Sequence, residues 1–398
     1  MAWVAGLVLV AAISLVAGEL GSRWWMRRYG RHSVWPPSWR LELRQDPEVW
    51  AEVEPRVRFE VNADGERGGD LPRDAAGLYR VLVAGGSAAE CFALDQPTSW
   101  PGTLERLLND AGSLRTLGAR RVHVGNIAHS GVGSAELDLI LERILPQYDH
   151  LDAILIMVGA SDIYHWLEEG APLHPPSMVP ELALFSCHPR QPFGWRPGQT
   201  RLAEVARRLR RSWLRPLEVK EHAGSWVVAA RRMRAAAKEV RASVPDAAPV
   251  LDHFERNFAR LVRRAQAHAD RVLILRQPWF ENHYTAEEAA RFWHGGMGKA
   301  WKETITVYYS LEIVNHLLGL VDARVAKIAT ALGVQNLTLR PLLTQGLRHY
   351  YDHDHFTAAG AAVIAGAVAA AMLRPPATTR PSRSGAVGDS SSAAVATG

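Results

Sequence analysis

Short apolar runs alternate with longer stretches of helical periodicity between residues 79 and 372. The apolar runs have the length and composition of strands, and they cover residues 80–84, 121–125, 153–158, 271–276 and 334–340. The helical patterns cover residues 100–109, 134–145, 252–268, 310–332 and 361–372. This alternation predicts an α/β fold, in which a five-stranded parallel sheet lies between two layers of helices as a three-layer α/β/α sandwich.

The first residues follow a different pattern. Residues 2–18 carry no charge and are almost entirely apolar, which is the short end of the length of a membrane-spanning helix. Tryptophans and arginines follow at 23–28, as is typical of a membrane interface. A cleaved signal peptide is the alternative, with small residues at 11–12 and 17–18, but the start lacks a positive charge. We expect an uncleaved transmembrane anchor over residues 1–20.

The remaining segments are less regular. Residues 21–78 show little periodicity, and we expect a membrane-proximal segment that packs onto the main domain. Residues 167–245 are an insertion: 167–200 are proline-rich and predict a loop, and 201–243 are arginine-rich and predict helix. Such a basic helix either presents a solvated face or lies on an anionic membrane. Residues 373–398 hold little to bury and predict a disordered tail.

Composition excludes few classes of protein. The chain has 398 residues, a formal net charge of +5 and ordinary hydrophobicity, so a large core is possible and a polyanionic partner is only weakly indicated. No nucleic-acid-binding motif occurs, and we expect no nucleic-acid partner. Two cysteines, Cys91 and Cys187, are too few for a disulfide framework. They form either one bridge or two reduced thiols.

Polar residues follow three of the predicted strands, and a further cluster precedes the last helix. The ends of parallel strands share one edge of a sheet, where ligands bind in open α/β folds. The four blocks are Gly85-Gly86-Ser87, Asn126 with Gly131, Gly159-Ala160-Ser161-Asp162, and Asp352 with His355 before Phe-Thr.

In this order, the four blocks resemble those of the SGNH/GDSL hydrolase family, and the resemblance covers residues 79–372. It implies the flavodoxin-like SGNH hydrolase fold, with Ser87 as the nucleophile and Asp352 and His355 as acid and base. The first block has Gly86 where the family usually has aspartate. The family's activity implies an acyl or acetyl ester of a lipid, glycan or small alcohol as substrate, and no cofactor.

The residue chemistry is consistent with this reading. A serine hydroxyl is a poor nucleophile until a base accepts its proton, and His355 is the candidate base. Asp352 lies three residues earlier, so it is able to accept from one ring nitrogen and leave the other for Ser87. The Gly-x-Ser-x-Gly pentapeptide of α/β-hydrolases is absent, because Ala89 follows where glycine is needed.

The oxyanion donors are the main departure from the family. The backbone N–H groups of Ser87 and Gly131 match two donors, but the third block has Ser161 where the family has asparagine. A lost oxyanion donor costs about 10²–10³ in kcat. The alternatives are therefore a weak or inactive binding or assembly module of the same fold, or an acyltransferase, at the cell envelope. The resemblance favours an extracytoplasmic domain, whereas the arginines after the anchor favour the cytoplasm; we expect the former.

Three further interpretations concern individual residues. The dense cluster of His349, Asp352, His353, Asp354 and His355 is of metal-ligand type, although we expect no metal because alternating loop residues rarely converge. Asn126 and Asp162 suit turn-closing hydrogen bonds. Gln277 and Trp279, after the fourth strand, either line the pocket or pack. A nucleotide-binding flavodoxin-like protein would need a phosphate loop, and Gly85-Gly86-Ser87 lacks its spacing.

Overall fold

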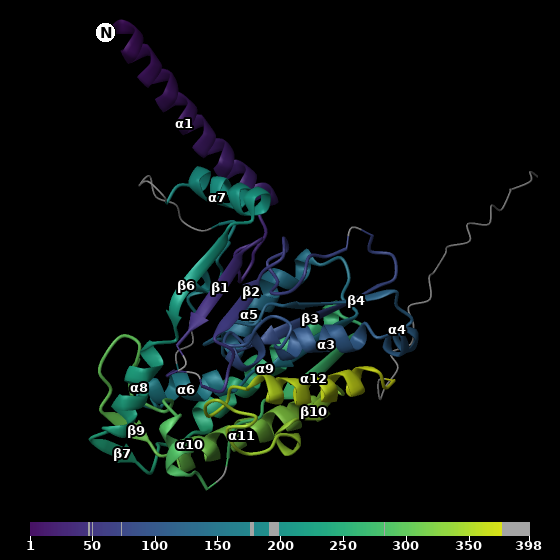
Figure 1. Cartoon of the computed structure of the whole chain (residues 1–398), viewed down its shortest axis with the longest axis vertical. Coiled ribbons are helices and arrows are strands. Elements are labelled where there is room, and N and C mark those ends of the chain that lie inside the picture. Colours follow the sequence, from purple (N-terminus) through teal and green to yellow (C-terminus); the bar gives the residue numbers. More distant parts are fainter. Residues whose placement is uncertain are drawn as a thin grey trace, which may run out of the picture.

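The structure is a computed structural model that describes residues 1–46, 48–49, 51–72, 74–175, 179–190, 199–281 and 283–375. Most of the predicted disordered tail, from residue 376 onward, lies outside the described residues. Helix α1 rises from one end of the described chain, and the sheets and the remaining helices lie below it (Figure 1).

A five-stranded, wholly parallel sheet forms the centre of the fold, as predicted. Its strands are β3 (Leu78–Gly85), β4 (Arg121–Asn126), β5 (Ala153–Met157), β8 (Arg271–Arg276) and β10 (Gln335–Thr338). They lie in the order β10-β8-β5-β3-β4. Numbered along the sheet's own chain order this is 2-1-3-4-5, the flavodoxin-like arrangement, whose switch point lies between β3 and β5. A ligand site is therefore expected beyond the carboxyl ends of these two strands.

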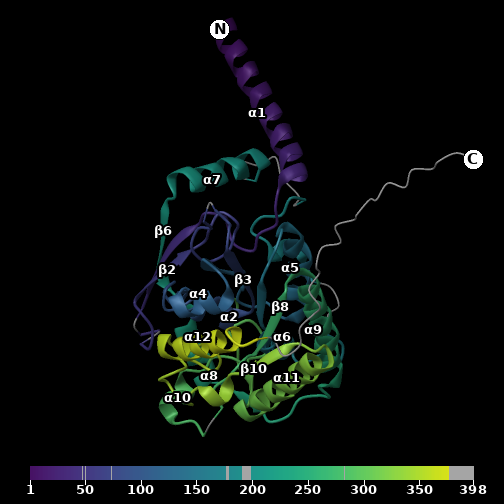
Figure 2. The same ribbon diagram turned by 90° about the vertical axis from the view of Figure 1, so that its right-hand side faces the viewer.

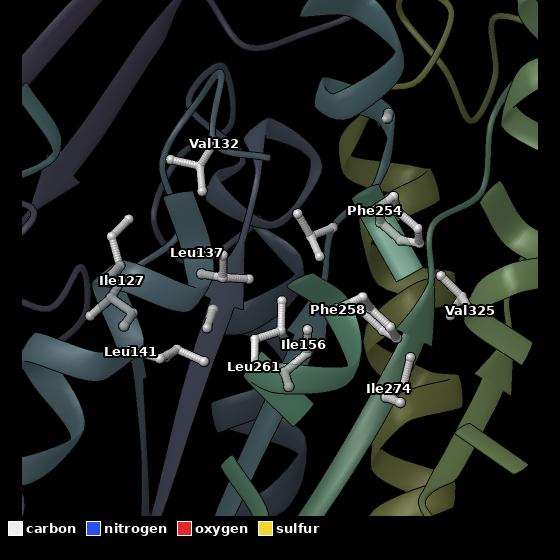
Figure 3. Close-up of a cluster of buried hydrophobic side chains, with 14 of the residues drawn as sticks. Ile127, Val132, Leu137, Leu141, Ile156, Phe254, Phe258, Leu261, Ile274 and Val325 are labelled. Carbon is white, nitrogen blue, oxygen red and sulfur yellow. The ribbon is translucent and has the colours of Figure 1, made fainter. Parts of the chain in front are cut away.

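Helices cover both faces of the sheet, so the three-layer prediction is also correct. Neighbouring residues of β3 alternate between two hydrophobic clusters, since successive strand side chains point to opposite faces. One cluster (Figure 3) packs the sheet against α5 (Ser134–Ile144), α6 (Ala160–Glu168), α9 (Ala248–His268) and α11 (Leu311–Ala331). The other packs it against α2 (Ser87–Glu90), α3 (Trp100–Leu108) and α12 (Ala358–Met372).

A second sheet was not expected from the sequence. It has the order β2-β1-β6, and its strands are β1 (Arg40–Gln45), β2 (Arg56–Glu60) and β6 (Leu217–Ala223). The expectation of helix throughout 201–243 is therefore wrong, and 21–78 is more regular than expected. The signal was present in β1 and β2, where buried apolar residues alternate strictly with charged ones. The sheet packs on the main core through Leu43, Val57 and Phe59.

The other elements are short, apart from two helices. Helix α1 (Ala2–Tyr29) is long and apolar enough to cross a membrane, a test that a signal sequence also passes. Helix α7 (Arg201–Leu214) lies crosswise at its base in both views (Figures 1 and 2). The rest are α4 (Ala111–Leu117), η1 (Leu145–Gln147), η2 (Glu181–Leu184), α8 (Trp226–Ala235), β7 (Glu239–Arg241), α10 (Ala286–Ala290), β9 (Val307–Tyr309) and η3 (Arg340–Leu342).

Candidate active site

The loop before α12 holds a carboxylate and an imidazole in direct contact. The Nδ1 atom of His355 lies 2.8 and 2.9 Å from the two carboxylate oxygens of Asp352. Asp352 also accepts hydrogen bonds from the backbone N–H groups of residues 354 and 355 and from the indole of Trp293. These donors hold the carboxylate in place, so His355 has its Nδ1 side engaged and its Nε2 side available.

Ser87 stands at the carboxyl end of β3, as the first residue of α2. Two glycines allow this turn: a Cβ at Gly85 would lie 2.0 Å from the carbonyl oxygen of Met157, and one at Gly86 would lie 3.1 Å from that of Val132. Any side chain at position 85 would collide with β5. The strand pairing thus requires glycine immediately before the serine turn, and the turn directs Ser87 to the sheet edge.

One cavity of about 330 Å³ opens at this edge and joins the predicted residues. Ser87, Gly131, Ser161, Asp352 and His355 all line it. Within the described part of the chain, no hydrogen bond connects Ser87 with His355. Catalytic hydrogen bonds of unliganded sites are often long and tighten only around substrate. The structure therefore brings the five residues to one cavity with the serine and histidine not yet bonded.

The segments after β4 and β5 carry Gly131 and Ser161, two of the residues predicted to donate to an oxyanion. Gly131 has φ of +75°, a left-handed conformation that favours glycine. The hydroxyl of Ser161 faces Gly86, since a Cβ on that glycine would lie 3.4 Å from it. Ser130, beside Gly131, donates both its N–H and its hydroxyl to the buried carboxylate of Glu90, which follows Ser87 by one helical turn. Glu90 therefore ties the loop of Gly131 to the helix of Ser87.

A buried arginine holds the end of α2, the helix that begins at Ser87. Arg67 donates to the carbonyl oxygens of Glu90, Cys91 and Leu94, the last two at 2.8 and 2.7 Å. Burial lowers the pKa of Arg67 to about 10, which still leaves the side chain charged at neutral pH. Because residue 67 lies in the segment between α1 and β3, that segment is part of the support of the serine turn.

The comparisons with known proteins agree with this architecture without adding weight to it. No family model and no curated protein matches the sequence. Among solved structures, the acetylxylan esterase Axe2 from Geobacillus stearothermophilus is 13% identical over 76% of this chain and 97% of its own, with a TM-score of 0.41. A member of the lipolytic G-D-S-L family from Veillonella parvula is 8% identical over 75% of this chain and 100% of its own, with a TM-score of 0.39. The α/β hydrolase LAE5 from the Lake Arreo metagenome is 13% identical over 75% of this chain and 97% of its own, with a TM-score of 0.40.

TM-scores near 0.4 do not establish a shared fold, and the assignment instead rests on the 2-1-3-4-5 strand order and on the four blocks that this order gathers at one edge. The fold is a flavodoxin-like α/β/α sandwich, as the resemblance to the SGNH/GDSL hydrolases predicts. In the terms of this fold, β3, β4 and β5 end in the first three blocks, and the loop before α12 carries the fourth.

The carboxylates at this site raise the basicity of its histidine. Burial alone would lower the pKa of His355, but the carboxylates of Asp352 and Asp354 outweigh it and raise that pKa to about 9. In return, although burial would raise the pKa of Asp352, the charged imidazole holds it well below its usual range. Burial raises the pKa of Asp354 to about 6, so this second carboxylate is also ionised at neutral pH.

The other histidines of the cluster are engaged elsewhere. His353 lies between the hydroxyl of Tyr164 and the amide oxygen of Asn315, at 2.8 and 2.9 Å, and burial lowers its pKa to about 3. His349 accepts a hydrogen bond from the backbone of residue 344. Both rings therefore serve the loop structure and do not join a ligand set with Asp352.

A different set of side chains has metal-ligand spacing. His294, from the loop before β9, lies near Asp354 and His355, with facing ligand atoms within 4.8 Å of one another. Two other such groups among the described residues lie elsewhere: His32 with Glu181 and His188, and His150 with Asp152 and Asp270. The Nδ1 atom of His355 lies 3.6 Å from Asp354 and already bonds Asp352, so a metal held by that nitrogen would compete with the Asp352 bond.

Sequence reasoning missed a second part of the cavity lining. We call it the distal wall, and it consists of Leu43, Gln45, Lys220, Ala223, Trp226 and Trp301. It comes from β1, β6, the start of α8 and the loop before β9. Trp226 and Trp301 are 38% and 45% exposed, and Trp226 packs edge-on against Trp293 at 4.8 Å between centroids. Through Trp293 and its bond to Asp352, the distal wall touches the catalytic loop.

The secondary interpretations have mixed outcomes. Asn126 and Asp162 make side-chain-to-backbone bonds, Asn126 to residues 89 and 128 and Asp162 to the N–H of residue 134. Gln277 and Trp279 line a separate small cavity between α6 and α11, so the pocket-lining alternative is wrong for them. Gln277 does reach the site indirectly, by donating to Asp354 at 3.2 Å. Cys91 and Cys187 are both buried and unbridged.

Proposed function

We propose that this protein is a serine ester hydrolase of the SGNH type, in which Ser87, His355 and Asp352 carry out nucleophilic catalysis. The observation that supports this most directly is the Asp352–His355 pair at the same cavity as Ser87. A carboxylate on Nδ1 leaves the Nε2 lone pair for a proton from serine, which is the arrangement that activates a weak nucleophile.

In the proposed reaction, the Oγ atom of Ser87 attacks the ester carbonyl while Nε2 of His355 accepts its proton. The N–H groups of Ser87 and Gly131 and the hydroxyl of Ser161 donate to the oxyanion of the tetrahedral intermediate. The intermediate collapses, and His355 gives the proton to the departing alcohol. Water then loses a proton to His355, attacks the acyl-enzyme, and releases the acid and Ser87.

The cavity bounds the substrate. At about 330 Å³ it suits a short acyl group together with part of the alcohol, and its distal wall includes two tryptophans, Trp226 and Trp301. We propose an acyl or acetyl ester as the substrate class, with transfer to a second alcohol in place of water as a variant of the same chemistry.

Labelling with a fluorophosphonate probe tests the proposal. The wild-type protein is expected to form a covalent adduct at Ser87, and Ser87→Ala and His355→Ala are expected to lose it. Ser243→Ala, which removes an exposed serine far from the cavity lining, is the matched control and should label like the wild type. A folded wild-type protein that neither labels nor cleaves short-chain p-nitrophenyl esters would contradict the proposal.

A second candidate function, a binding or assembly module that keeps the fold, is favoured by one observation. Ser161 supplies a shorter donor than the asparagine that the family resemblance implies, and Ser87 is not bonded to His355. Binding of an ester without its hydrolysis would support this candidate. The wild type and Ser87→Ala would then bind the ester equally, and neither would release its alcohol.

For the membrane, we propose that α1 is an uncleaved anchor and that the catalytic domain lies outside the cytoplasm. The helix runs without a break from Ala2 to Tyr29, across both sets of small residues where a peptidase would cut. The mass of the mature chain tests cleavage, and digestion of the domain in intact spheroplasts tests orientation. A protected domain would place it in the cytoplasm, as the arginines after the apolar run favour.

A further inference from the structure

Helix α7 has its charged side facing the protein and its apolar side facing outward. At 100° per residue, Leu202, Val205, Ala206, Leu209 and Trp213 fall on one face. On this side Leu209 is 45% exposed and Trp213 78%, and the next residue, Leu214, is 72% exposed. An exposed apolar helix face of this kind marks a surface that something else covers.

The opposite face of α7 carries its charged pairs. Within the helix, Glu204 pairs with Arg201 and, at 3.0 Å, with Arg208. Arg201 also donates to the carbonyl oxygen of His188 at 3.0 Å, outside the helix. Arg211 lies 3.9 Å from Glu218 at the start of β6. A surface helix of a soluble protein normally has the reverse orientation, with apolar residues inward. The helix is therefore not simply a solvated face.

Contacts between α7 and α1 define where the apolar face of α7 lies relative to α1. The carboxylate of Glu19 accepts the backbone N–H groups of Arg201 and Leu202, at 3.1 and 2.8 Å, and so caps the start of α7. Leu202 also meets α1 at Gly18, where an added Cβ would lie 3.3 Å from its side chain. Residue 18 is the last of the uncharged run, so the apolar face of α7 begins where the apolar surface of α1 ends.

We propose that α7 is a second membrane contact, lying flat in the interface of the bilayer that α1 enters, with Leu209 and Trp213 in the acyl region. Its crosswise position at the base of α1 suits this placement (Figures 1 and 2). Arg210 is exposed beside the apolar face, where its stem reaches lipid and its guanidinium group reaches phosphate. The lipid surface this favours is anionic.

A second copy of this chain is the alternative partner that could cover the apolar face of α7. Arg210 beside it makes self-association through this face unfavourable, because a two-fold contact would bring like charges together. The same positive charge favours an anionic lipid surface. The proposal extends beyond the enzymatic function, and it does not depend on the activity of Ser87.

Spin labels on the full-length protein test the proposal. Single cysteines replace Leu209, Trp213, Ser212 and Ser243, and a further one replaces Leu9 in the apolar half of α1. Unmodified protein serves as the blank, because both native cysteines are buried. The labelled proteins are reconstituted in vesicles of phosphatidylcholine with phosphatidylglycerol. Collisions of each label with oxygen and with a water-soluble nickel chelate are measured.

The expected result is a several-fold higher ratio of oxygen to nickel collisions at 209 and 213 than at 212 and 243, with Arg210→Glu reducing it. Nickel access at 209 and 213 equal to that at 243 would overturn the proposal. Dipolar broadening between labels at 213 of two copies would also overturn it, in favour of a dimer. The label at residue 9 reports separately on α1, so failure of the anchor is distinguishable from failure of α7.

Discussion

The two walls of the cavity differ in how the chain builds them. Ser87, Gly131 and Ser161 follow successive strands of the parallel sheet, and Asp352 and His355 share one short loop. The distal wall instead depends on β1 and β6, which pair in parallel although residues 40 and 217 are far apart in sequence. The first wall holds the hydroxyl, carboxylate and imidazole groups that are able to react, whereas the distal wall holds two partly exposed tryptophans, Trp226 and Trp301. We infer that the first determines the reaction and the second the substrate.

The largest expected effect comes from the catalytic loop. Asp352→Asn should lower kcat by about 10⁴, because an amide in place of the carboxylate stabilises the wrong tautomer of His355. Steady-state kinetics on a p-nitrophenyl ester measure it, with thermal unfolding as the check that the loop persists. A loss of less than tenfold in a stable variant would mean that Asp352 does not orient a catalytic base.

Ser161 is the next test, on the oxyanion side of the same wall. Ser161→Ala should lower kcat by about 10² if its hydroxyl donates to the oxyanion, at the lower end of the range for such donors. Ser161→Asn should raise turnover, because the amide is the longer and more directional donor. If alanine, serine and asparagine give equal rates, this position does not face the oxyanion.

The distal wall should respond in KM and not in kcat. Trp226→Ala removes a partly exposed indole that packs against Trp293, and we expect KM to rise about tenfold, equal to about 1.4 kcal/mol of binding. Trp213→Ala removes an exposed tryptophan outside the cavity lining and is the matched control for a soluble substrate. A fall in kcat with unchanged KM would show that the distal wall contributes to the chemistry as well.

The same contrast explains what the sequence could reveal. The strand-end blocks and the Asp352–His355 pair are local patterns, and a parallel sheet necessarily gathers them at one edge. The alternation in β1 and β2, and in Leu217-Glu218-Val219 of β6, predicts strands but not their partners. The parallel pairing of β1 with β6 is non-local, and only that pairing brings Lys220 and Trp226 to the cavity that Ser87 lines. Trp293 gave no signal beyond its position in a glycine-containing loop.

The smallest expected effect is a shift in the pH dependence of kcat/KM when the charge of Asp354 beside His355 is removed. His355 acts as base only when neutral, and its pKa is raised to about 9. In the wild type, kcat/KM should therefore rise with pH, reach half of its maximum near pH 9 and level off above that. Asp354 lies 3.6 Å from Nδ1 of His355, and its carboxylate helps to keep the imidazole protonated.

Asp354→Asn removes that charge, so the pKa of His355 should fall and the rise in kcat/KM should move to lower pH. At pH 7 a larger fraction of the variant's histidine is neutral, and the variant should be the faster enzyme by a factor of a few. Asp270→Asn, an exposed carboxylate outside the cavity lining, should leave the profile unchanged. A profile that stays in place in Asp354→Asn would mean that Asp352 alone sets the basicity of His355. An upward shift would mean that the charge of Asp354 does not reach the imidazole and that the bond from Gln277 positions the loop.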